Sequence, residues 1–468
     1  MVVQSAARAG VARQAEYDST PEMTGLVEYL VHVRDRDVPA EVLEKGKHHL
    51  LDTLAAIVSG SRLLPGQLGI RHVARLGGHP HCTVIGTQLR TNPVNAALAN
   101  GISAHADETD DSHLEGRFHP GGGIVPAAFA AAEANGSTGL HFLRAVILGY
   151  DVGVRFNLSL GPRKPYSGGH SPHSTGPLFG ASAAAGALYG FDERQWRHHL
   201  SFTIQQASGV QCWIRDHQHT EKAFDFAGMP ARNALAAASM IADGFTGVDD
   251  ALQEPNGFYS AFSTNPQPQR LVEELGSRYE IMRASIKKWC VGSPIQGAMD
   301  AVMAILASGP LQPESIDRIE IELPDDRAAL VNARTMANVS VQHLVALAIV
   351  DAGVTFASVH DDERLHDPAI ADLVERTVLT ANAELTTALP PRQVILNIDL
   401  RDGTRLSHRT HAVRGTPANP MTRSEVVAKA HDLVDGIMGK DRASRLVETV
   451  LDVEHAPSLG ELISLLQF

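Results

Sequence analysis

The stretch AEVLEKGKHHLLDTLAAIVSG, residues 40–60, has the pattern of a long buried helix. Its aliphatic side chains recur at helical spacing and form one stripe, which comprises Leu43, Leu50, Leu51, Leu54, Ile57 and Val58. Gly60 follows where a helix C-terminus favours a left-handed residue. Residues 126–134, 180–189 and 230–242 have the same helical character, and their Ala and Gly content lets helix axes approach closely. We therefore expect a mainly helical body.

The pattern changes after about residue 275. Ile319, Ile321 and Leu323 alternate with glutamates, and residues 394–400 alternate in the same way, which is typical of strands. Asp402-Gly403 then supplies the positive backbone angles of a tight hairpin turn before a second strand over 405–413.

Helical periodicity returns after a Pro/Gly-bearing link at 415–420. Thr422 and Glu425 form a capping box at the start of the new helix. The expected fold class is mainly α with α+β, and the expected order is a flexible tail (1–20), a helical domain (21–275), a smaller α+β lid domain (276–412) and a return to the helical domain (413–468).

Charge and cysteine content exclude several classes of function. The 468 residues carry a net charge of -13 without a run of Lys or Arg longer than two, so neither nucleic acid nor an anionic membrane is an expected partner. No stretch approaches the roughly eighteen apolar residues of a membrane span. Three distant cysteines without a C-x-x-C pair predict neither a disulfide framework nor a metal cluster, and favour a cytoplasmic protein.

The densest group of titratable side chains is HADETDDSH, residues 105–113, with His119-Pro120 and three glycines following. Imidazoles beside carboxylates can exchange protons near neutral pH, so we consider Glu108, Asp111, Ser112 and His119 candidate site residues. An alternative is that Asp111 and Ser112 cap the next helix. A divalent metal is a further alternative, but the fixed ligand spacing of known metal motifs is absent.

Two further segments carry candidate residues. His170-Ser-Pro-His173 ends a Gly/Pro loop before a helix expected to begin near Pro177, and His173 is the better candidate of its two histidines. Residues 213–225 form an unusually polar loop, in which Lys222 and Arg215 could clamp substrate carboxylates. The alternative for these residues, and for Lys287 and Lys288, is an ordinary solvated side chain.

An ordered series of motifs along most of the chain resembles the MmgE/PrpD family. The matching segments are LLDTLAAIVSGS (50–61), TVIGTQ (83–88), ALANGISAHADETDDSH (97–113), HPGGGIVPAA (119–128), HSTG (173–176), GFTG (244–247), NGFYSAFS (256–263), IKKW (286–289) and SVQH (340–343).

The resemblance implies a large discontinuous helical domain, a smaller α+β lid, a homodimer, and an active site without metal or cofactor between the domains. Family members include 2-methylcitrate dehydratase, cis-aconitate decarboxylase and iminodisuccinate epimerase. By the same resemblance the catalytic residues are His119, His173, Lys222 and Lys287. Glu108, Asp111, Ser112, Arg215 and Lys288 are the expected substrate-binding residues.

Three departures from the family pattern concern the substrate. Glu108 stands where the motif usually has Asp, the tyrosine of the decarboxylase branch falls near Ala328, and Asp216–His219 is a polar insertion. We therefore predict a metal-independent lyase, a dehydratase that removes water from a β-hydroxy polycarboxylic acid. The alternatives are a decarboxylase, an isomerase or epimerase, a non-catalytic dimer that binds an organic acid, and a metal-dependent hydrolase.

Overall fold

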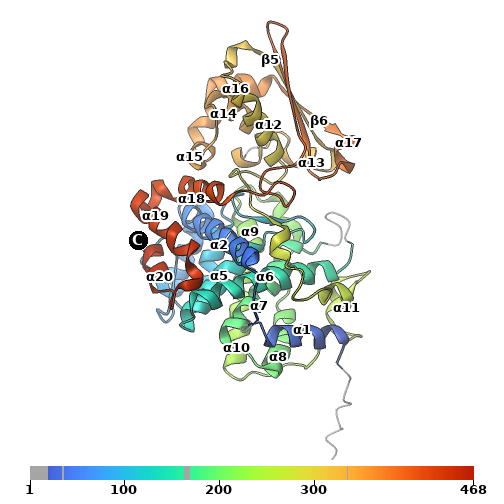
Figure 1. The fold of residues 1–468 in the computed structure, drawn as a ribbon, viewed down its shortest axis with the longest axis vertical. Coiled ribbons are helices and arrows are strands. Elements are labelled where there is room, and N and C mark those ends of the chain that lie inside the picture. The colour runs from blue at the N-terminus through green and yellow to red at the C-terminus, as the bar shows by residue number, and fades with distance from the viewer. Residues whose placement is uncertain (1–18, 34–35, 163–168, 335) are drawn as a thin grey trace, which may run out of the picture.

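The computed structural model describes residues 19–33, 36–162, 169–334 and 336–468. Apart from Ser19 and Thr20, the flexible tail expected over residues 1–20 lies outside the described residues. A mainly helical body and a smaller part with a four-stranded sheet are stacked along the long axis (Figure 1). The expected fold class is confirmed.

One hydrophobic cluster holds the body together, and it joins residues from both ends of the chain. Helix α18 packs against α2, so the C-terminal segment lies beside the N-terminal one (Figure 1). The helices of the body are α1 (Pro21–Val31), α2 (Ala40–Gly60), α3 (Leu64–Leu76), α4 (Pro93–Ala104), α5 (Pro120–Ala134), α6 (Gly139–Ser159), α7 (Pro172–Tyr189), α8 (Glu193–Gln205), α9 (Thr220–Ala223), α10 (Met229–Ala242), α11 (Phe258–Phe262), α18 (Arg423–Met438), α19 (Lys440–Leu451) and α20 (Gly460–Leu466). Its short strands are β1 (Cys82–Thr83), β2 (Arg90–Thr91), β3 (Ser112–His113) and β4 (Ala284–Ser285).

Small residues let the body helices approach closely, as expected. A Cβ atom on Gly149 of α6 would lie 2.9 Å from the Gly180 carbonyl oxygen of α7, and one on Gly180 would lie 2.5 Å from the Gly149 oxygen. Both helices therefore need glycine where their backbones meet.

Gly60 has a different role from the expected one. It is the last residue of α2, and the cap after it is Ser61 with a right-handed φ of -61°. A Cβ atom on Gly60 would lie 1.9 Å from the Ser103 carbonyl oxygen of α4. The prediction of a left-handed cap is wrong, because glycine is needed here for helix packing.

The second part, called the lid below, has its own hydrophobic cluster from Val291 to Ile398. Its sheet has the order β6-β5-β7-β8, in which only the β5–β6 pair is parallel. Its elements are α12 (Gln296–Ala307), β5 (Ile316–Pro324), α13 (Asp325–Val331), α14 (Val341–Val350), α15 (Phe356–Val359), α16 (Pro368–Glu375), β6 (Thr377–Asn382), α17 (Ala383–Thr387), β7 (Val394–Leu400) and β8 (Arg405–Thr410).

The hairpin between β7 and β8 has a three-residue loop. The Leu400 N–H donates to the Thr404 carbonyl oxygen at 2.8 Å, so three residues form the loop, and of its residues only Gly403 has a positive φ, 87°. The hairpin predicted at Asp402-Gly403 is therefore present, but positive backbone angles were expected of this dipeptide and only Gly403 has one, as in a three-residue hairpin connection.

None of the helices in the described part of the chain combines the length and the apolar character that crossing a bilayer requires.

Candidate active site

A cavity of about 750 Å³ lies between the body and the lid. On the body side its wall includes Glu108, Ser112, His119, His173, His219 and Lys222, and on the lid side Arg327, Leu330, Arg334 and Met336. Among the described residues, the wall includes six Lys or Arg and four Asp or Glu, in a chain with a net charge of -13. The charged groups on a cavity wall set the electrostatic potential inside the cavity, so this excess of positive side chains favours an anionic ligand.

One local feature positions the polar loop of residues 105–113, and another positions His119. The loop follows the end of α4, and β3 then pairs with β4, with Ser112 opposite Ser285. This pairing brings Lys287, which follows β4, next to the loop. His119 is the N-cap residue of α5, and the next residue is Pro120, which suits the first position of a helix.

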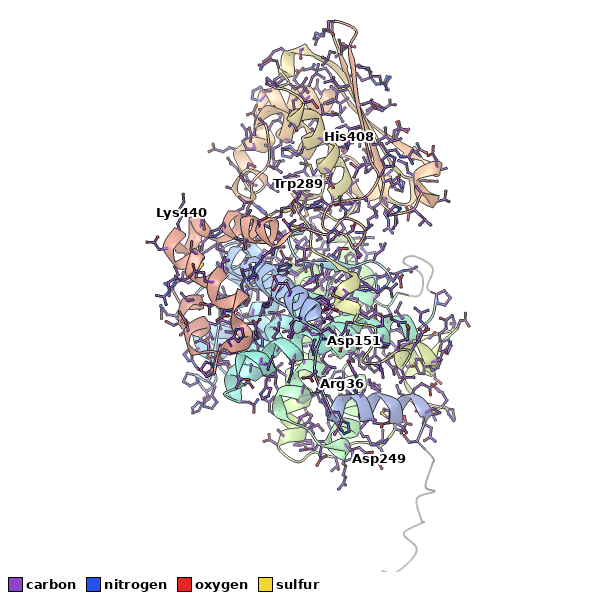
Figure 2. The ribbon with its side chains drawn as sticks, in the orientation of Figure 1. Arg36, Asp151, Asp249, Trp289, His408 and Lys440 are labelled. Atoms are coloured by element: carbon purple, nitrogen blue, oxygen red, sulfur yellow. The ribbon has the colours of Figure 1, made fainter. Side chains whose placement is uncertain are left out.

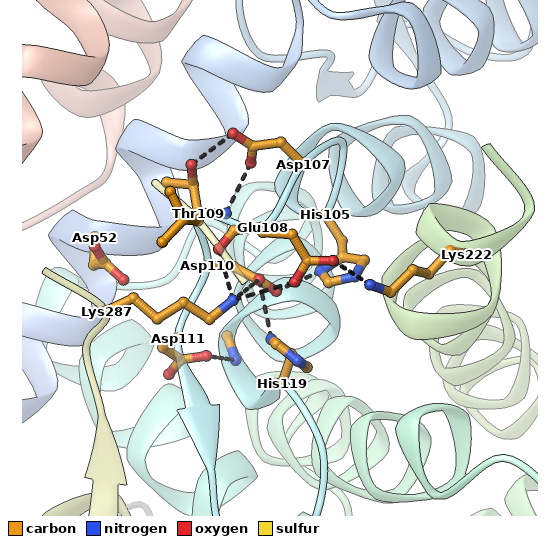
Figure 3. A network of polar contacts seen from close by, with 12 residues as sticks. Asp52, His105, Asp107, Glu108, Thr109, Asp110, Asp111, His119, Lys222 and Lys287 are labelled. Carbon is orange, nitrogen blue, oxygen red and sulfur yellow. Dashed lines mark hydrogen bonds and ion pairs between the residues drawn. The ribbon is translucent and has the colours of Figure 1, made fainter. Parts of the chain in front are cut away.

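Asp110 is the centre of the polar network (Figure 3). Its carboxylate is fully buried and lies 2.9 Å from Nδ1 of His105 and 3.1 Å from Nδ1 of His119. Burial raises the pKa of Asp110, but His105, His119 and Lys287 outweigh this effect and hold it well below the usual value. An ionised carboxylate only accepts hydrogen bonds, so both imidazoles donate from Nδ1. Nε2 of His119 is therefore left as a proton acceptor.

His119 and His173 lie together, with ring centres 5.6 Å apart. Burial lowers the pKa of His119 and holds that of His173 well below its usual value, so both rings are neutral at pH 7. The His173 ring stacks on Phe226 at 4.0 Å between ring centres. Helix α7 begins at Pro172, so the helix start expected near Pro177 is wrong and His173 lies in the first turn.

Lys222 lines the cavity and approaches Glu108 from the side opposite to Lys287 (Figure 3). Its ammonium group pairs with Oε1 of Glu108 and lies 5.1 Å from the centre of the Phe226 ring. The segment 213–225, expected to be a loop, contains α9, the end of a 3-10 helix (Gln211–Arg215) and the start of a π-helix (Phe224–Gly228). These turns fix the backbone at Lys222. The backbone N–H of Lys222 donates to Oδ2 of Asp216 at 3.0 Å.

Lys287 is buried between two carboxylates and is not one of the residues that line the cavity. Its Nζ donates to the Glu108 carbonyl oxygen at 2.6 Å and lies 3.6 Å from Oδ1 of Asp110 and 3.7 Å from Oε2 of Glu108. Its contacts in this structure are with the protein's own anions.

The other predicted residues differ in position. Ser112 lines the cavity, whereas Arg215 is exposed and does not. Lys288 lies 4.0 Å from Glu425 and over the ring of Trp289. Trp289 lies where the lid meets the body (Figure 2). Asp111 is fully buried, and its oxygens accept from Tyr150, His49 and the Gly121 N–H of α5. These contacts favour the structural alternative for Asp111.

Among the described residues, three titratable side chains that contact Glu108 or His119 were not expected at the site: His105, Asp110 and His219. His105 and Asp110 belong to the polar loop, but nothing in the spacing of this loop distinguishes Asp110 from its acidic neighbours. His219 lies in the polar insertion, and its Nε2 lies 3.1 Å from Oε1 of Glu108. His219 and Glu108 are 111 positions apart in the sequence, so local spacing could not predict this contact.

In the part of the chain that the structure describes, two groups of buried side chains have the spacing of a metal site, His105–Asp110–His119 and His105–Glu108–His219. The carboxylates of both groups already face ammonium groups, because Lys287 lies between Asp110 and Glu108 and Lys222 pairs with Glu108. A divalent cation would meet these two positive charges at close range. The donor sets therefore do not fit a resident metal.

Comparison with known proteins decides the family. The model of the MmgE/PrpD N-terminal domain matches residues 24–271, and that of the MmgE/PrpD C-terminal domain matches residues 289–454. The chain belongs to the MmgE/PrpD family. Within this family, it is 26% identical to the cis-aconitate decarboxylase-like protein oryM of Aspergillus oryzae, over 96% of this chain and 98% of that relative.

Other MmgE/PrpD relatives are more distant. The chain is 23% identical to cis-aconitate decarboxylase of Aspergillus terreus, with 92% of each chain covered. It is 22% identical to cis-aconitate decarboxylase of Homo sapiens, over 93% of this chain and 91% of the human one. These relatives support lyase-like chemistry at the level of the family.

Proposed function

We propose that the protein is a lyase that needs no metal and moves a proton at a carbon next to a carboxylate of a small polycarboxylic acid. The observation that carries this proposal is the Asp110–His119 pair, because His119 lines a cavity whose described wall residues include more cationic than anionic side chains. A carboxylate that holds one ring nitrogen as a donor makes the other a base, which is the arrangement of known proton-transfer sites.

In the proposed reaction the substrate is a β-hydroxy acid. Nε2 of His119 removes the proton from the α-carbon, and the electron pair of that C–H bond forms the new double bond as the bond to the β-hydroxyl breaks. Lys222 gives a proton to the departing oxygen, which leaves as water. His173 is placed 5.6 Å from His119 to orient the substrate from the neighbouring wall. Cationic side chains of the wall stabilise the charge that develops on the carboxylate.

Decarboxylation is the second candidate, and the names of the relatives favour it. In that reaction the bond to a carboxylate breaks, CO₂ leaves, and the electron pair left on the carbon takes a proton from the Lys222 ammonium group. The position near the decarboxylase tyrosine is Ala328, a small residue in the hydrophobic cluster of the lid, and it has no group that can transfer a proton. We therefore place dehydration first.

Product analysis tests the proposal. Chelator-treated protein is incubated with a panel of β-hydroxy tricarboxylic acids and unsaturated tricarboxylic acids, and the products are identified by proton NMR and CO₂ release. A new alkene without CO₂ supports dehydration, CO₂ supports the second candidate, and a rearranged acid of unchanged mass supports an isomerase. His119→Asn removes the activity, whereas His72→Asn, on the exposed face of α3, keeps it. If the panel binds and no reaction occurs, the proposal is wrong and the protein is a binder.

A further inference from the structure

Two buried lysines donate to consecutive carbonyl groups of the polar loop of residues 105–113. Nζ of Lys287 donates to the Glu108 carbonyl oxygen at 2.6 Å, and Nζ of Lys429 donates to the Thr109 carbonyl oxygen at 2.9 Å. Buried carbonyl groups need a donor, and neither of these two belongs to a helix or strand that would supply a backbone N–H. The two ammonium groups therefore take the place of a regular hydrogen-bond ladder.

The Thr109 carbonyl belongs to the peptide group that joins Thr109 to Asp110. A peptide group is planar, so a donor that binds its oxygen also fixes the direction in which the next residue leaves it. Asp110 is the carboxylate that lies 3.1 Å from Nδ1 of His119. Lys429 thus holds the backbone directly before the side chain that sets the proton of His119.

We propose that Lys429 is a positioning residue of the site, which keeps Asp110 directed at His119 by holding the Thr109 carbonyl. Lys429 lies on α18, in the segment that returns to the body after the lid, and it is not one of the described residues that line the cavity. The inference rests on the proposed function, in which His119 removes a proton. It extends the site to the C-terminal segment of the chain.

The environment of Lys429 keeps its ammonium group in place. Lys429 is buried, and its Nζ lies 2.6 Å from Oδ1 of Asp52, a buried carboxylate of α2. Burial lowers the pKa of Lys429, but Asp52 outweighs burial and raises it, so the group is charged at neutral pH. A charged donor makes a stronger hydrogen bond than a neutral one. The packing of α18 against α2 is thus linked to the backbone of the polar loop.

The other polar groups of Thr109 are held separately. The Thr109 N–H donates to Oδ1 of Asp107 at 2.9 Å, and the Thr109 hydroxyl group donates to Oδ2 of Asp107 at 2.6 Å. Without the Lys429 ammonium group, the peptide group between Thr109 and Asp110 could therefore rotate while the part of the loop before it stays fixed. A misplacement of about 1 Å at a reacting group can lower a rate by roughly 10²-fold, so a small rotation is enough to affect catalysis.

The kinetic test removes the ammonium group in Lys429→Met, whose side chain is similar in shape. We expect kcat to fall by about 10²-fold, the size of effect that a misplaced group near the reacting atoms has. KM should change little, since Lys429 does not line the described cavity wall.

Lys47→Met is the matched control. Lys47 is also buried and also joins α2 to the C-terminal segment, because its Nζ donates to Glu454 at 2.7 Å. This substitution should lower the Tm and leave kcat unchanged. Equal changes of kcat in Lys429→Met and Lys47→Met would overturn the proposal.

A double-mutant cycle tests whether Lys429 acts through Asp110. If it does, Lys429→Met should lower kcat little further in an Asp110→Asn background, where the carboxylate charge is already lost. A role in stability alone would lower kcat by the same factor in both backgrounds, and this result would contradict the proposal. Lys429→Met leaves Asp52 buried without its cation, so Asp52→Asn/Lys429→Met, which has no unpaired charge, is measured beside it and should show the same loss.

A second measurement does not depend on turnover. Histidine labelled with ¹⁵N is used to record the Nδ1 and Nε2 resonances of His119, which are assigned by their loss in His119→Asn. In the unmodified protein and in Lys47→Met the proton should stay on Nδ1, whereas in Lys429→Met it should be distributed over both nitrogens. If it stays on Nδ1 in Lys429→Met and in Asp52→Asn/Lys429→Met, the proposal is wrong, whatever the enzyme assays show. If it is redistributed and none of the tested acids reacts, the proposed function fails while the positioning role of Lys429 stands.

Discussion

Nδ1 of His119 lies 3.1 Å from Oδ1 of Asp110, and His105 occupies the other oxygen of the same carboxylate at 2.9 Å. One buried anion thus sets the protonation of two imidazoles. Because His119 is the N-cap of α5 and Asp110 belongs to the loop before β3, the pair depends on the antiparallel contact of β3 with β4. The fold of this loop therefore decides the chemistry of the site.

The first prediction concerns the charge of Asp110. Asp110→Asn keeps the size of the side chain but removes the charge that holds the Nδ1 proton of His119, so kcat should fall by about 10²–10⁴-fold. Asp435→Asn is the control, because Asp435 also pairs with a histidine, His431 at 2.8 Å, on α18. Steady-state kinetics and thermal unfolding are measured for both. If Asp110→Asn folds and its kcat stays within twofold of the wild type, Asp110 does not set the state of His119.

The second prediction concerns Asp225 in the π-helix. Burial raises its pKa from 3.8 to about 7, although Ser171 donates a hydrogen bond to it. The folded-state pKa lies above the unfolded one, so its contribution to stability is full below pH 3.8 and is lost as the pH rises through about 7. Asp225→Asn stays neutral and should raise the Tm at pH 8 by roughly 2 °C or more, and less at pH 5.

The control for this variant is Asp243→Asn, at an exposed position after α10. It should leave the Tm unchanged at both pH values. An Asp225→Asn variant whose Tm change is the same at pH 5 and pH 8 would show that Asp225 titrates as an ordinary surface carboxylate.

The third prediction concerns the contact of the lid with the polar loop of residues 105–113. Nε2 of His360, after α15 of the lid, lies 3.1 Å from Oδ2 of Asp107. Burial opposes the charged imidazole, but Asp107 outweighs burial and raises the pKa of His360. A raised pKa means that the contact stabilises the lid fully below about pH 6.5 and weakens as the pH rises through the folded value.

Hydrogen exchange of α15 measures this contact. At pH 6 the backbone amides of α15 should exchange more slowly in the wild type than in His360→Gln. At pH 9 this difference between the two proteins should be smaller. The Phe356 N–H bond to Asp432, 2.8 Å long, anchors α15 in both proteins. His366→Gln, at an exposed position of the lid, should behave like the wild type. Equal protection of the wild type and His360→Gln at pH 6 would rule out this role.

The fourth prediction concerns metal ions. Because Lys287 and Lys222 already neutralise Asp110 and Glu108, activity should survive exhaustive chelation, and added Zn²⁺ or Mg²⁺ should not increase it. The metal content of the chelated, active protein is measured by mass spectrometry. Loss of activity on chelation that a single metal restores would contradict the assignment.

Much of the fold could be predicted from local patterns. The stripe of α2, the capping box of α18 and the alternation of β5 and β7 depend on spacing within one segment. Strand β6 was not predicted, because it is half-exposed and its parallel register with β5 depends on a pairing some sixty positions away in the sequence. Gly60 was misinterpreted for a similar reason, since its contact is with α4 and not with its own turn.

The site could be predicted only in part. His119, His173 and Lys222 lie on one cavity wall, whereas Arg215 and Lys288 lie elsewhere. The role of Asp110 follows from which acidic side chain of the loop points to two histidines, and spacing alone does not give this. The contact of His219 with Glu108 depends on how the polar insertion folds back on the loop.

The most direct test of the central claim is hydrogen exchange at the substrate carbon. A reactive acid from the panel is incubated in D₂O with the wild type and with His119→Asn, and proton NMR follows the signal of the α-carbon. The account predicts that the wild type exchanges this hydrogen with solvent or removes it during turnover, and that His119→Asn does neither although it still binds the acid. Turnover by the wild type that leaves the α-hydrogen in place, or full exchange by His119→Asn, would contradict it.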